Sequence, residues 1–564
     1  MTRAPVSAAE IASRIARART SDATAGALTH LPFRTFADLL DARAELGDRP
    51  YLVYYDDAGV RTELSYEAFA ERVAGRARAL ATRAGVGRGD RVATLMHNHP
   101  EAPITCFAAW RLGATMVPVN VAEDDDRIRF VLQDAAVKAV VFLPDYAARA
   151  EALRAGGPER TWLSSASLDD APARLDDPHD VHDRHALRRP EPEDDALIVY
   201  TSGTTGPPKG VVLSQTNLLV DADGITRWHG FDATSRLQCV LPIHHVNGLI
   251  VTLVTPFFAG ASVVLLRRFR TQDFWRRIAD ENVHVVSVVP TLLAFLLEAA
   301  EGSNAVVPPG FRYVICGAGP LTVDLAARFE DRFGVRILHG YGLSETTCYS
   351  CFLPLDLPRE DHTRWMREYG FPSIGVPIEP NEMAIHDAEG RALPAGARGE
   401  IVIRGVNVMK GYHARPDANA ETFAFGWFRS GDEGFFEADT HGRQFFFITG
   451  RLKELIIRGG VNLSPFEIDE VLCRIPGVAR GLAVGFENDW YGEEVGAYVM
   501  REPGADLDEG AVLAACRSKL PFAKAPKVVV FGDDIPVTST GKYQRGRLGH
   551  LFTPWKATQF RDGR

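Results

Sequence analysis

The sequence predicts an α/β protein with at least two domains, and three observations support this prediction. The chain has 564 residues, more than a single hydrophobic core usually organises. From about Phe33, helical patterns alternate with short apolar runs, which is typical of layered α/β domains with mostly parallel sheets. With 46% hydrophobic and 24% charged residues, the composition is that of an ordinary soluble globular protein.

The first elements follow from capping residues and apolar periodicity. Ser7 and Glu10 are spaced as a capping box that opens a short amphipathic helix. Ser65 is a predicted N-cap. After it, the patterns predict a helix at 66–83, a strand at 91–96, a helix at 102–112 and an extended segment at 115–118.

Gly248–Leu266 is a long apolar stretch without a formal charge, long enough to raise the question of a transmembrane helix. Pro256 and Gly260 interrupt it, so we expect a buried helix followed by a buried strand, without stable insertion into a membrane. Asp169–Asp195 is instead rich in charged residues and proline, and it is expected to be an exposed connector.

A break near Gly450–Glu454 divides the chain. The run from 444 to 449 is a predicted strand, and a smaller segment of helices and strands follows it. We therefore expect a large N-terminal domain of layered α/β subdomains over residues 1–450 and a small C-terminal domain over residues 451–564.

Charge and cysteine content narrow the function classes. The 63 basic and 73 acidic residues give a formal net charge of −10, which argues against nucleic acid as a general partner. Seven cysteines are scattered without a disulfide framework, and the N-terminus has no apolar signal core. Both observations favour a cytoplasmic protein.

The segment Tyr200–Gly210 carries the strongest functional signal. It follows Ala196–Tyr200, a predicted buried strand, and it is dense in Gly, Ser and Thr. Backbone N–H groups and hydroxyls in such a loop form a nest for an anion, and Lys209 adds a mobile positive charge, so the polyphosphate of a nucleotide is the expected ligand. The common P-loop is excluded because Pro208 stands where its second glycine is required. A flexible surface turn is the alternative.

Four further segments could complete a site. His339–Thr347 contains one carboxylate, which suits Mg2+ because this ion prefers one or two carboxylates together with phosphate oxygens. Trp427–Asp432 places an acid in a tight turn, where it could accept hydrogen bonds from ribose hydroxyls. Gly450–Gly460 offers basic residues at the predicted break, and Pro536–Arg545 presents one lysine on a flexible turn. Each segment taken alone is better explained as an ordinary turn.

Together and in this order, these segments resemble the adenylate-forming superfamily, which includes acyl-CoA synthetases, firefly luciferase and the adenylation domains of nonribosomal peptide synthetases. The resemblance runs from about Phe33 to Arg547. It implies that ATP, with Mg2+, activates a carboxylic acid to an acyl-adenylate, and that the acyl group then passes to a thiol. It also implies that the small C-terminal α+β domain is mobile and swings after adenylation.

The resemblance assigns roles to individual positions. The phosphates would be held by Thr201, Ser202, Gly203, Thr204, Thr205, Gly206 and Lys209. The rest of the nucleotide would be held by Gly317, Ala318, Gly319, Tyr341, Gly342, Ser344, Asp432 and Arg451, with the tyrosine ring on the adenine and the last two residues on the ribose. The catalytic set would comprise Glu345 as the Mg2+ ligand, His245 as the gate of the acid pocket, Lys453 as the hinge, and Lys542 as the cation between the acyl carboxylate and the α-phosphate. The path of a pantetheine arm would be lined by Gly459 and Gly460.

The acid is constrained only loosely by the sequence. No aspartate occurs between Leu241 and Thr255 to pair with an amine, so an α-amino acid is not expected. The pocket candidates are mixed and mostly apolar, which indicates a small or medium carboxylic acid, aliphatic or aryl. These candidates are Val246, Asn247, Gly317, Leu343 and Cys348. His245 and His339 could instead be structural, hydrogen-bonded histidines.

Coenzyme A is the expected thiol, because His245–Gly248 and Arg458–Gly460 resemble free-standing acyl-CoA ligases. The cluster Arg267, Arg268 and Arg270 could bind the phosphates of CoA, or it could be a solvated basic face. An enzyme that loads an acyl carrier protein is the second hypothesis. A nucleotide-binding protein without catalysis is the third, and the acidic and basic residues named above argue against it.

Overall fold

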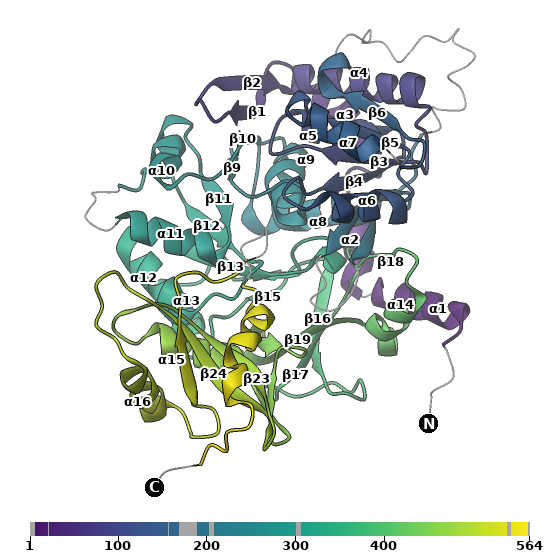
Figure 1. Cartoon of the computed structure of the whole chain (residues 1–564). Helices are drawn as coiled ribbons and strands as arrows, with labels where there is room; N and C mark the ends of the chain where they lie inside the picture. The colour runs from purple at the N-terminus through teal and green to yellow at the C-terminus, as the bar shows by residue number, and fades with distance from the viewer. Residues whose placement is uncertain are drawn as a thin grey trace.

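A computed structural model describes residues 6–20, 22–155, 157–168, 189–201, 208–300, 306–537 and 543–561. Within these ranges the chain forms four sheets, three of them upstream of residue 452 and the fourth downstream of it. Figure 1 shows the C-terminal segment, in yellow and green, beneath the layered sheets and helices of the rest of the chain.

Two large sheets are mostly parallel, as the alternating pattern predicts; the nine-stranded sheet has antiparallel pairs at both edges and the seven-stranded sheet at one edge only. The seven-stranded sheet has the order β18 (Gly411–Tyr412), β8 (Lys209–Ser214), β7 (Asp195–Thr201), β4 (Thr115–Val119), β3 (Arg91–Leu95), β5 (Ala139–Phe142) and β6 (Thr161–Ser164). The nine-stranded sheet has the order β15 (Val376–Pro377), β14 (Cys351–Phe352), β13 (Arg336–Tyr341), β12 (Tyr313–Cys316), β11 (Val285–Val288), β9 (Arg236–Cys239), β10 (Ser262–Leu266), β1 (Pro50–Tyr55) and β2 (Arg61–Ser65).

The other two sheets are smaller and largely antiparallel. One contains β16 (Asn381–His386), β17 (Gly399–Gly405), β19 (Phe428–Ala438) and β20 (Gln444–Arg451). The other contains β22 (Val461–Leu463), β21 (Ile456–Arg458), β24 (Gly492–Arg501) and β23 (Val478–Asn488), with β25 (Val528–Phe531) parallel to β24.

The helices cover the faces of these sheets. Before residue 250 they are α1 (Ala8–Ala18), α2 (Asp22–His30), α3 (Phe36–Ala44), α4 (Tyr66–Ala84), α5 (Glu101–Arg111), α6 (Asp125–Asp134), α7 (Ala147–Arg154), α8 (Gln215–His229) and the π-helical η3 (Asn247–Val254). After it they are α9 (Thr255–Ala259), α10 (Thr271–Asp280), α11 (Pro290–Ala300), α12 (Val323–Phe333), α13 (Arg359–Arg367), α14 (Pro416–Thr422), α15 (Pro465–Cys473) and α16 (Glu509–Lys519). Short 3-10 segments add η1 (Pro144–Tyr146), η2 (Ser165–Ser167), η4 (Ser344–Thr346), η5 (Ala424–Gly426) and η6 (Arg545–Trp555).

Capping explains where two of the predicted helices begin. The Ser65 hydroxyl accepts a hydrogen bond from the N–H of Ala68, so α4 starts where the sequence predicts. At α1 only half of the predicted capping box forms. The Ser7 hydroxyl accepts from the N–H of Glu10, but the Glu10 carboxylate pairs with Arg14 one turn later at 2.8 Å.

The apolar stretch Gly248–Leu266 is buried in the protein, as expected. It forms all of η3 except its first residue, then α9, and after Gly260 the strand β10, which lies between β9 and β1. Among the described residues, no helix is long and apolar enough to cross a membrane. The connector predicted at Asp169–Asp195 lies for the most part outside the described residues.

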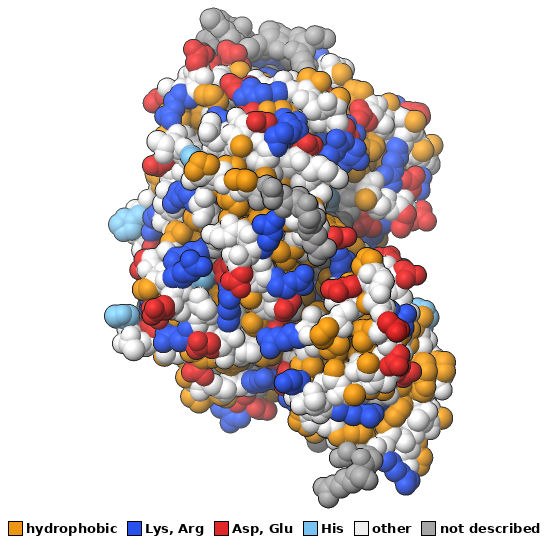
Figure 2. All heavy atoms as spheres, turned by 90° about the vertical axis from the view of Figure 1, so that its left-hand side faces the viewer, with side chains coloured by type: hydrophobic (Ala, Val, Ile, Leu, Met, Phe, Trp, Pro, Cys, Tyr) orange, Lys and Arg blue, Asp and Glu red, His pale blue; other side chains and the backbone are white. Residues whose placement is uncertain are grey.

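Upstream of residue 452, a large core of buried side chains runs through the sheets and a separate one lies where α6 and α7 cover the seven-stranded sheet; the C-terminal segment has cores of its own. Figure 2 shows that positive and negative side chains are interspersed over one face of the molecule. The two parts meet where the Glu470 carboxylate of α15 accepts the N–H of Val323, at 2.9 Å, and that of Asp324, at 3.2 Å. The division at residue 450 stays a prediction.

Candidate active site

The predicted anion-binding lysine lies beside the predicted metal ligand. Strand β18 pairs antiparallel with β8, and this pairing brings the Tyr412 ring to 4.9 Å from the ammonium nitrogen of Lys209. The Tyr412 hydroxyl donates to Oε1 of Glu345 at 2.8 Å. Burial and the neighbouring carboxylate raise the pKa of Tyr412 well above its usual range, so it stays a donor. These residues form one cluster of a cation, a carboxylate and a hydroxyl.

Sequence reasoning missed Tyr412. Its place in the site depends on an edge strand only two residues long, which joins a partner about 200 residues away in the chain. No local pattern signals such a pairing.

A second cluster contains Tyr341, Asp432 and Arg451. Asp432 and Arg451 face each other on β19 and β20, and Nε of the arginine lies 3.1 Å from one carboxylate oxygen. The Tyr341 hydroxyl, at the end of β13, donates to the other oxygen at 2.7 Å. Asp432 is 4% exposed, whereas the arginine side chain is 42% exposed. A buried carboxylate with both oxygens engaged is held in one orientation.

The two clusters are within electrostatic reach of each other. The pKa of Arg451 is raised first by Asp432, and Tyr341 and Glu345 add to the effect. The guanidinium therefore interacts with the carboxylates of both clusters. This places Lys209, Glu345, Asp432 and Arg451 around one region of the protein.

Two predicted glycines sit where a side chain would collide with backbone. A Cβ on Gly317 would lie 2.5 Å from the Tyr349 hydroxyl and 2.8 Å from the carbonyl oxygen of Gly340. A Cβ on Gly342 would collide with the carbonyl oxygen of Cys348. Both glycines let loops pack closely at the carboxyl ends of β12 and β13. Ala318, Gly319 and Ser344 follow in these loops and are partly exposed.

A buried carboxyl group supports the loop after Glu345. The side-chain amide of Asn407 donates to Asp221 Oδ1 at 2.9 Å and to the carbonyl of Thr346 at 3.2 Å. The Thr347 hydroxyl donates to the carbonyl of Asn407 at 2.6 Å. Asp221 is fully buried in α8, and burial raises its pKa to about 8. Sequence reasoning missed this support, because an Asp inside a helical pattern is ordinarily exposed.

The histidines divide into two kinds. His245 is partly exposed in the loop before η3, and its ring centroid lies 4.2 Å from that of His244. Burial lowers the pKa of His244 to about 4, so that ring is neutral near pH 7. His339 is buried, and its Nδ1 lies 2.9 Å from the carbonyl oxygen of Ser373. His339 therefore makes a structural hydrogen bond, one of the two alternatives that the sequence left open for it.

The structure describes only some of the remaining predicted site residues. Ser202, Gly203, Thr204, Thr205, Gly206 and Lys542 lie outside the described residues. Thr201 ends β7, next to Lys209. Lys453 is exposed in the turn between β20 and β21. Gly459 and Gly460 form the exposed turn of the β21–β22 hairpin, and no described heavy atom lies within 4 Å of a Cβ placed on Gly460. Their proposed path for pantetheine stays a prediction.

The three arginines near β10 converge on one carboxylate. Nε of Arg267 and Nε of Arg268 lie 2.9 Å and 2.7 Å from the oxygens of Asp57, and Arg270 lies 3.4 Å from it. Together with Tyr55 and Arg277 they line a small hollow. Asp56, Asp57 and Asp273 line this hollow with four arginines, and Arg267 also lies 3.5 Å from Asp145, so carboxylates offset most of the positive charge.

The described part of the chain contains no group of three or more His, Cys, Asp or Glu side chains that could hold a metal by themselves. Cys348 and Cys351 are buried free thiols, and burial raises the pKa of each. Within the described residues, Glu345 uses one carboxylate oxygen for Tyr412 and keeps the other, so it suits an ion that also takes ligands from a bound substrate.

Comparisons with known proteins show what the whole chain is similar to. The family model described as "AMP-binding enzyme" matches residues 40–413, and the one described as "AMP-binding enzyme C-terminal domain" matches residues 467–542. The sulfoacetate–CoA ligase of Cupriavidus necator is 36% identical over 519 residues, which cover 92% of this chain and 97% of that protein. The oxalate–CoA ligase of Arabidopsis thaliana is 34% identical, covering 86% of this chain and 91% of that protein. The crystal structure of ATP-bound MatB from Rhodopseudomonas palustris superposes with a TM-score of 0.80 at 29% identity, covering 92% and 99% of the two chains.

Proposed function

The chain belongs to the AMP-binding enzyme family and is an AMP-forming acid–thiol ligase, and on this premise we propose how its own residues bind ATP and which acid it activates. The reaction is the ATP-dependent conversion of a small or medium carboxylic acid to an acyl-adenylate, followed by transfer of the acyl group to coenzyme A. Relatives that act on sulfoacetate and on oxalate support a compact acid.

The observation that carries the assignment of roles is that Arg451 pairs with the buried carboxylate of Asp432 and that Glu345 also raises the pKa of its guanidinium. Asp432, fixed by Tyr341 and Arg451, would accept hydrogen bonds from the ribose hydroxyls. Glu345 and Lys209, on either side of Tyr412, would face the phosphates. A nucleotide that lies across these residues has its sugar at one cluster and its charged end at the other.

Mg2+ fits the cluster of Lys209, Glu345 and Tyr412, because within the described residues Glu345 keeps one carboxylate oxygen and phosphate oxygens would supply further ligands. When bound there, the ion would neutralise charge on the phosphates as it develops. Lys209 would share this task from the start of β8. Lys542, which lies outside the described residues, would supply the cation beside the α-phosphate.

The chemistry has two steps. In the first, an oxygen of the acid attacks the α-phosphorus, the bond from that phosphorus to the β-phosphate bridging oxygen breaks, and pyrophosphate leaves. In the second, the sulfur of the thiol attacks the acyl carbon and AMP leaves with the former acid oxygen. Positioning and charge neutralisation account for most of the catalysis in the first step. We propose Lys453 as the hinge for a movement of the C-terminal segment between the two steps.

Pyrophosphate exchange into ATP, driven by a panel of carboxylic acids, tests the first step. Exchange with at least one acid supports the proposal, whereas no exchange with any acid would favour a nucleotide-binding protein without catalysis. Adding coenzyme A, or in a parallel reaction a phosphopantetheinylated carrier protein, then identifies the acceptor. We expect thioester formation with coenzyme A. The arginine hollow near Asp57 would bind its phosphates, and Arg268→Ala should then raise the KM for coenzyme A while leaving exchange unchanged.

A further inference from the structure

Two neighbouring carboxylates on α15 bind different parts of the chain. Asp469 and Glu470 are consecutive residues of this helix, and both side chains are buried. The Asp469 carboxylate accepts hydrogen bonds from the guanidinium of Arg545, at 3.0 Å to Oδ1 and at 2.6 Å to Oδ2. The Glu470 carboxylate accepts instead from two backbone N–H groups upstream of residue 452, those of Val323 at 2.9 Å and of Asp324 at 3.2 Å. One helix therefore connects two separate parts of the protein.

The Asp469 contact anchors the segment that follows Lys542. Arg545 is 6% exposed, and both of its terminal nitrogens donate to the carboxylate. The N–H of Gln544 donates to the carbonyl of Pro536 at 2.7 Å, so the described residues before and after Lys542 are joined to each other. Because a buried ion pair of this kind is costly to break, we expect α15 and this segment to move together.

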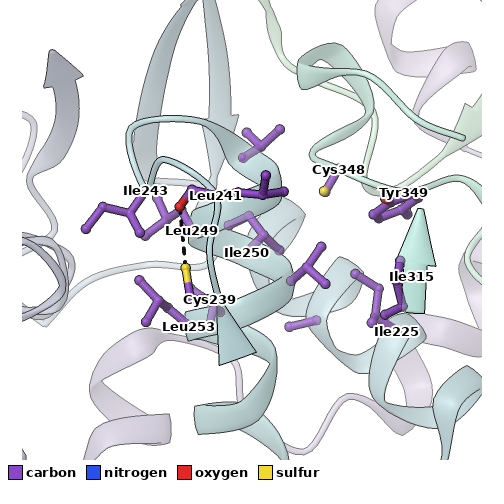
Figure 3. Packing of buried hydrophobic residues seen from close by; sticks show 14 of the residues in the cluster. Ile225, Cys239, Leu241, Ile243, Leu249, Ile250, Leu253, Ile315, Cys348 and Tyr349 are labelled. Atoms are coloured by element: carbon purple, nitrogen blue, oxygen red, sulfur yellow. Dashed lines mark hydrogen bonds between the residues drawn. The ribbon is translucent and has the colours of Figure 1, made fainter. Parts of the chain in front are cut away.

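The Glu470 contact attaches α15 to a part of the chain that is rooted in the large core. Val323 is the first residue of α12, which follows the Gly317–Gly319 loop at the end of β12. Ile315 of β12 is fully buried, and Figure 3 shows it beside Tyr349 among other buried side chains. In Figure 1, α15 lies below α12. The first N–H groups of a helix have no partner within the helix, and the helix dipole favours a negative charge there. Glu470 supplies that charge from the C-terminal segment.

A second contact joins the same two parts of the protein. The guanidinium carbon of Arg480, on β23, lies 5.4 Å from the centroid of the Phe295 ring on α11. Burial raises the pKa of Tyr543, and the nearby Arg480 opposes this shift, so the contact lies close to the residue that follows Lys542. The Gly459–Gly460 turn, by contrast, is exposed. This is the arrangement that the proposed first step requires, with the lysine segment rather than the glycine hairpin facing the rest of the chain.

We infer that Glu470 is a positioning residue for the first step. By binding the start of α12, it holds the C-terminal segment in the arrangement used for adenylation, and it must release α12 before the segment can move for the second step. This inference rests on the proposed function. A contact that exists in only one of two arrangements stabilises that arrangement alone. Its loss should therefore slow formation of the acyl-adenylate and spare formation of the thioester.

Glu470→Gln tests this inference with little change of side-chain shape. In the wild type, Oε2 accepts from Val323, whereas Oε1 accepts from Asp324 and, at 2.7 Å, from Arg474. Glutamine has one acceptor oxygen, so its NH2 group faces a backbone N–H donor whichever way the amide turns. With the acid that gives the fastest pyrophosphate exchange, the exchange rate should fall by about tenfold, the effect of losing one hydrogen bond to a charged group. Thioester formation from supplied acyl-adenylate should be unchanged.

The same helix offers a matched control. Glu467 lies three residues earlier on α15 and pairs with Lys524, within the C-terminal segment, at 2.8 Å. Glu467→Gln should leave both half-reactions unchanged. Phe295→Leu changes the partner on the other side, because it removes the ring beside Arg480. It should slow exchange by about two- to fivefold and again spare the second step.

The difference between the two half-reactions separates positioning from a general loss of structure, which would lower both equally. Equal losses in a folded Glu470→Gln protein, or no loss of exchange, contradict the inference and leave the proposed function intact. An equal loss of exchange in the Glu467→Gln control contradicts it as well. If Glu470→Gln does not fold, Phe295→Leu alone decides, and an unchanged exchange rate in that variant overturns the inference. No exchange with any acid in the wild type removes the proposed function, and the inference falls with it.

Discussion

Replacing Asp432 by asparagine removes one negative charge from a buried position without changing the side-chain shape. The Tyr341 hydroxyl still has an oxygen to donate to, at 2.7 Å in the wild type, and Arg451 is 42% exposed and can be solvated. The loss in folding stability should therefore be that of a half-exposed ion pair, about 1 kcal/mol or less. Binding of ATP should suffer more, because hydrogen bonds from ribose to a carboxylate become bonds to a neutral amide.

A hydrogen bond to a charged group contributes about 1.5–3 kcal/mol, which corresponds to roughly 10- to 150-fold in an equilibrium constant. We expect Asp432→Asn to lower kcat/KM for ATP by a factor in this range. The assay is pyrophosphate exchange at a saturating acid concentration, with ATP and with 2′-deoxy-ATP. Wild type should prefer ATP strongly, and the variant should discriminate little between the two nucleotides, because it has lost the group that senses the hydroxyl.

The same hairpin supplies a matched control. Asp439 pairs with Arg443 at 2.7 Å with side-chain exposures of 5% and 34%, close to the 5% and 42% of the Asp432–Arg451 pair. Asp439→Asn should cost similar stability and leave ATP kinetics unchanged. The ribose assignment is wrong if Asp432→Asn retains the wild-type preference for ATP over its 2′-deoxy analogue, or if the Asp439 control lowers kcat/KM equally.

Other predictions follow from the same contacts. Gly342→Ala should abolish exchange in a protein with a lowered Tm, because its Cβ would collide with the Cys348 carbonyl; exchange at the wild-type rate would contradict the close packing of this loop. Glu345→Ala should raise the Mg2+ concentration needed for half-maximal exchange sharply, and an unchanged Mg2+ titration would remove the metal assignment. Lys542→Ala should slow adenylation by about 100-fold or more and spare thioester formation from supplied acyl-adenylate, whereas an equal loss in both half-reactions would exclude its proposed role. Burial raises the pKa of Asp221 from 3.8 to about 8, so the protonated carboxyl group stabilises the fold at acid pH, and this stabilisation is lost as the pH rises through 8. Between pH 6 and pH 9 the Tm of Asp221→Asn should therefore fall less than that of wild type. Parallel curves of Tm against pH for the two proteins would refute the assignment.

Local sequence patterns were enough to predict the parts of the fold that depend on residues close to one another in the chain. The start of α4 follows from the Ser65 cap, and the buried course of Gly248–Leu266 follows from its apolar composition and its interruptions. The capping box at Ser7 was only half right, because a competing partner for Glu10 lies one turn further on. Local rules predict which contacts are possible, and competition among partners decides which of them form.

The sequence by itself determined the family, the alternation of helices and strands, and most of the charged residues of the site, including Lys209, Glu345, Asp432 and Arg451. These features can be predicted because they depend on short sequence segments whose combination of residue types serves few physical purposes. The roles assigned to them remain proposals.

Only the tertiary structure decided how these residues are supported. Asp221 of α8 and the segment with Asn407 and Tyr412 hold the Glu345 loop, and Asn247 at the start of η3 donates to the Tyr349 hydroxyl. Each of these side chains is an ordinary residue in its own stretch of sequence. Their partners lie up to about 190 residues away, and such contacts exist only after strand pairing and packing have brought the segments together.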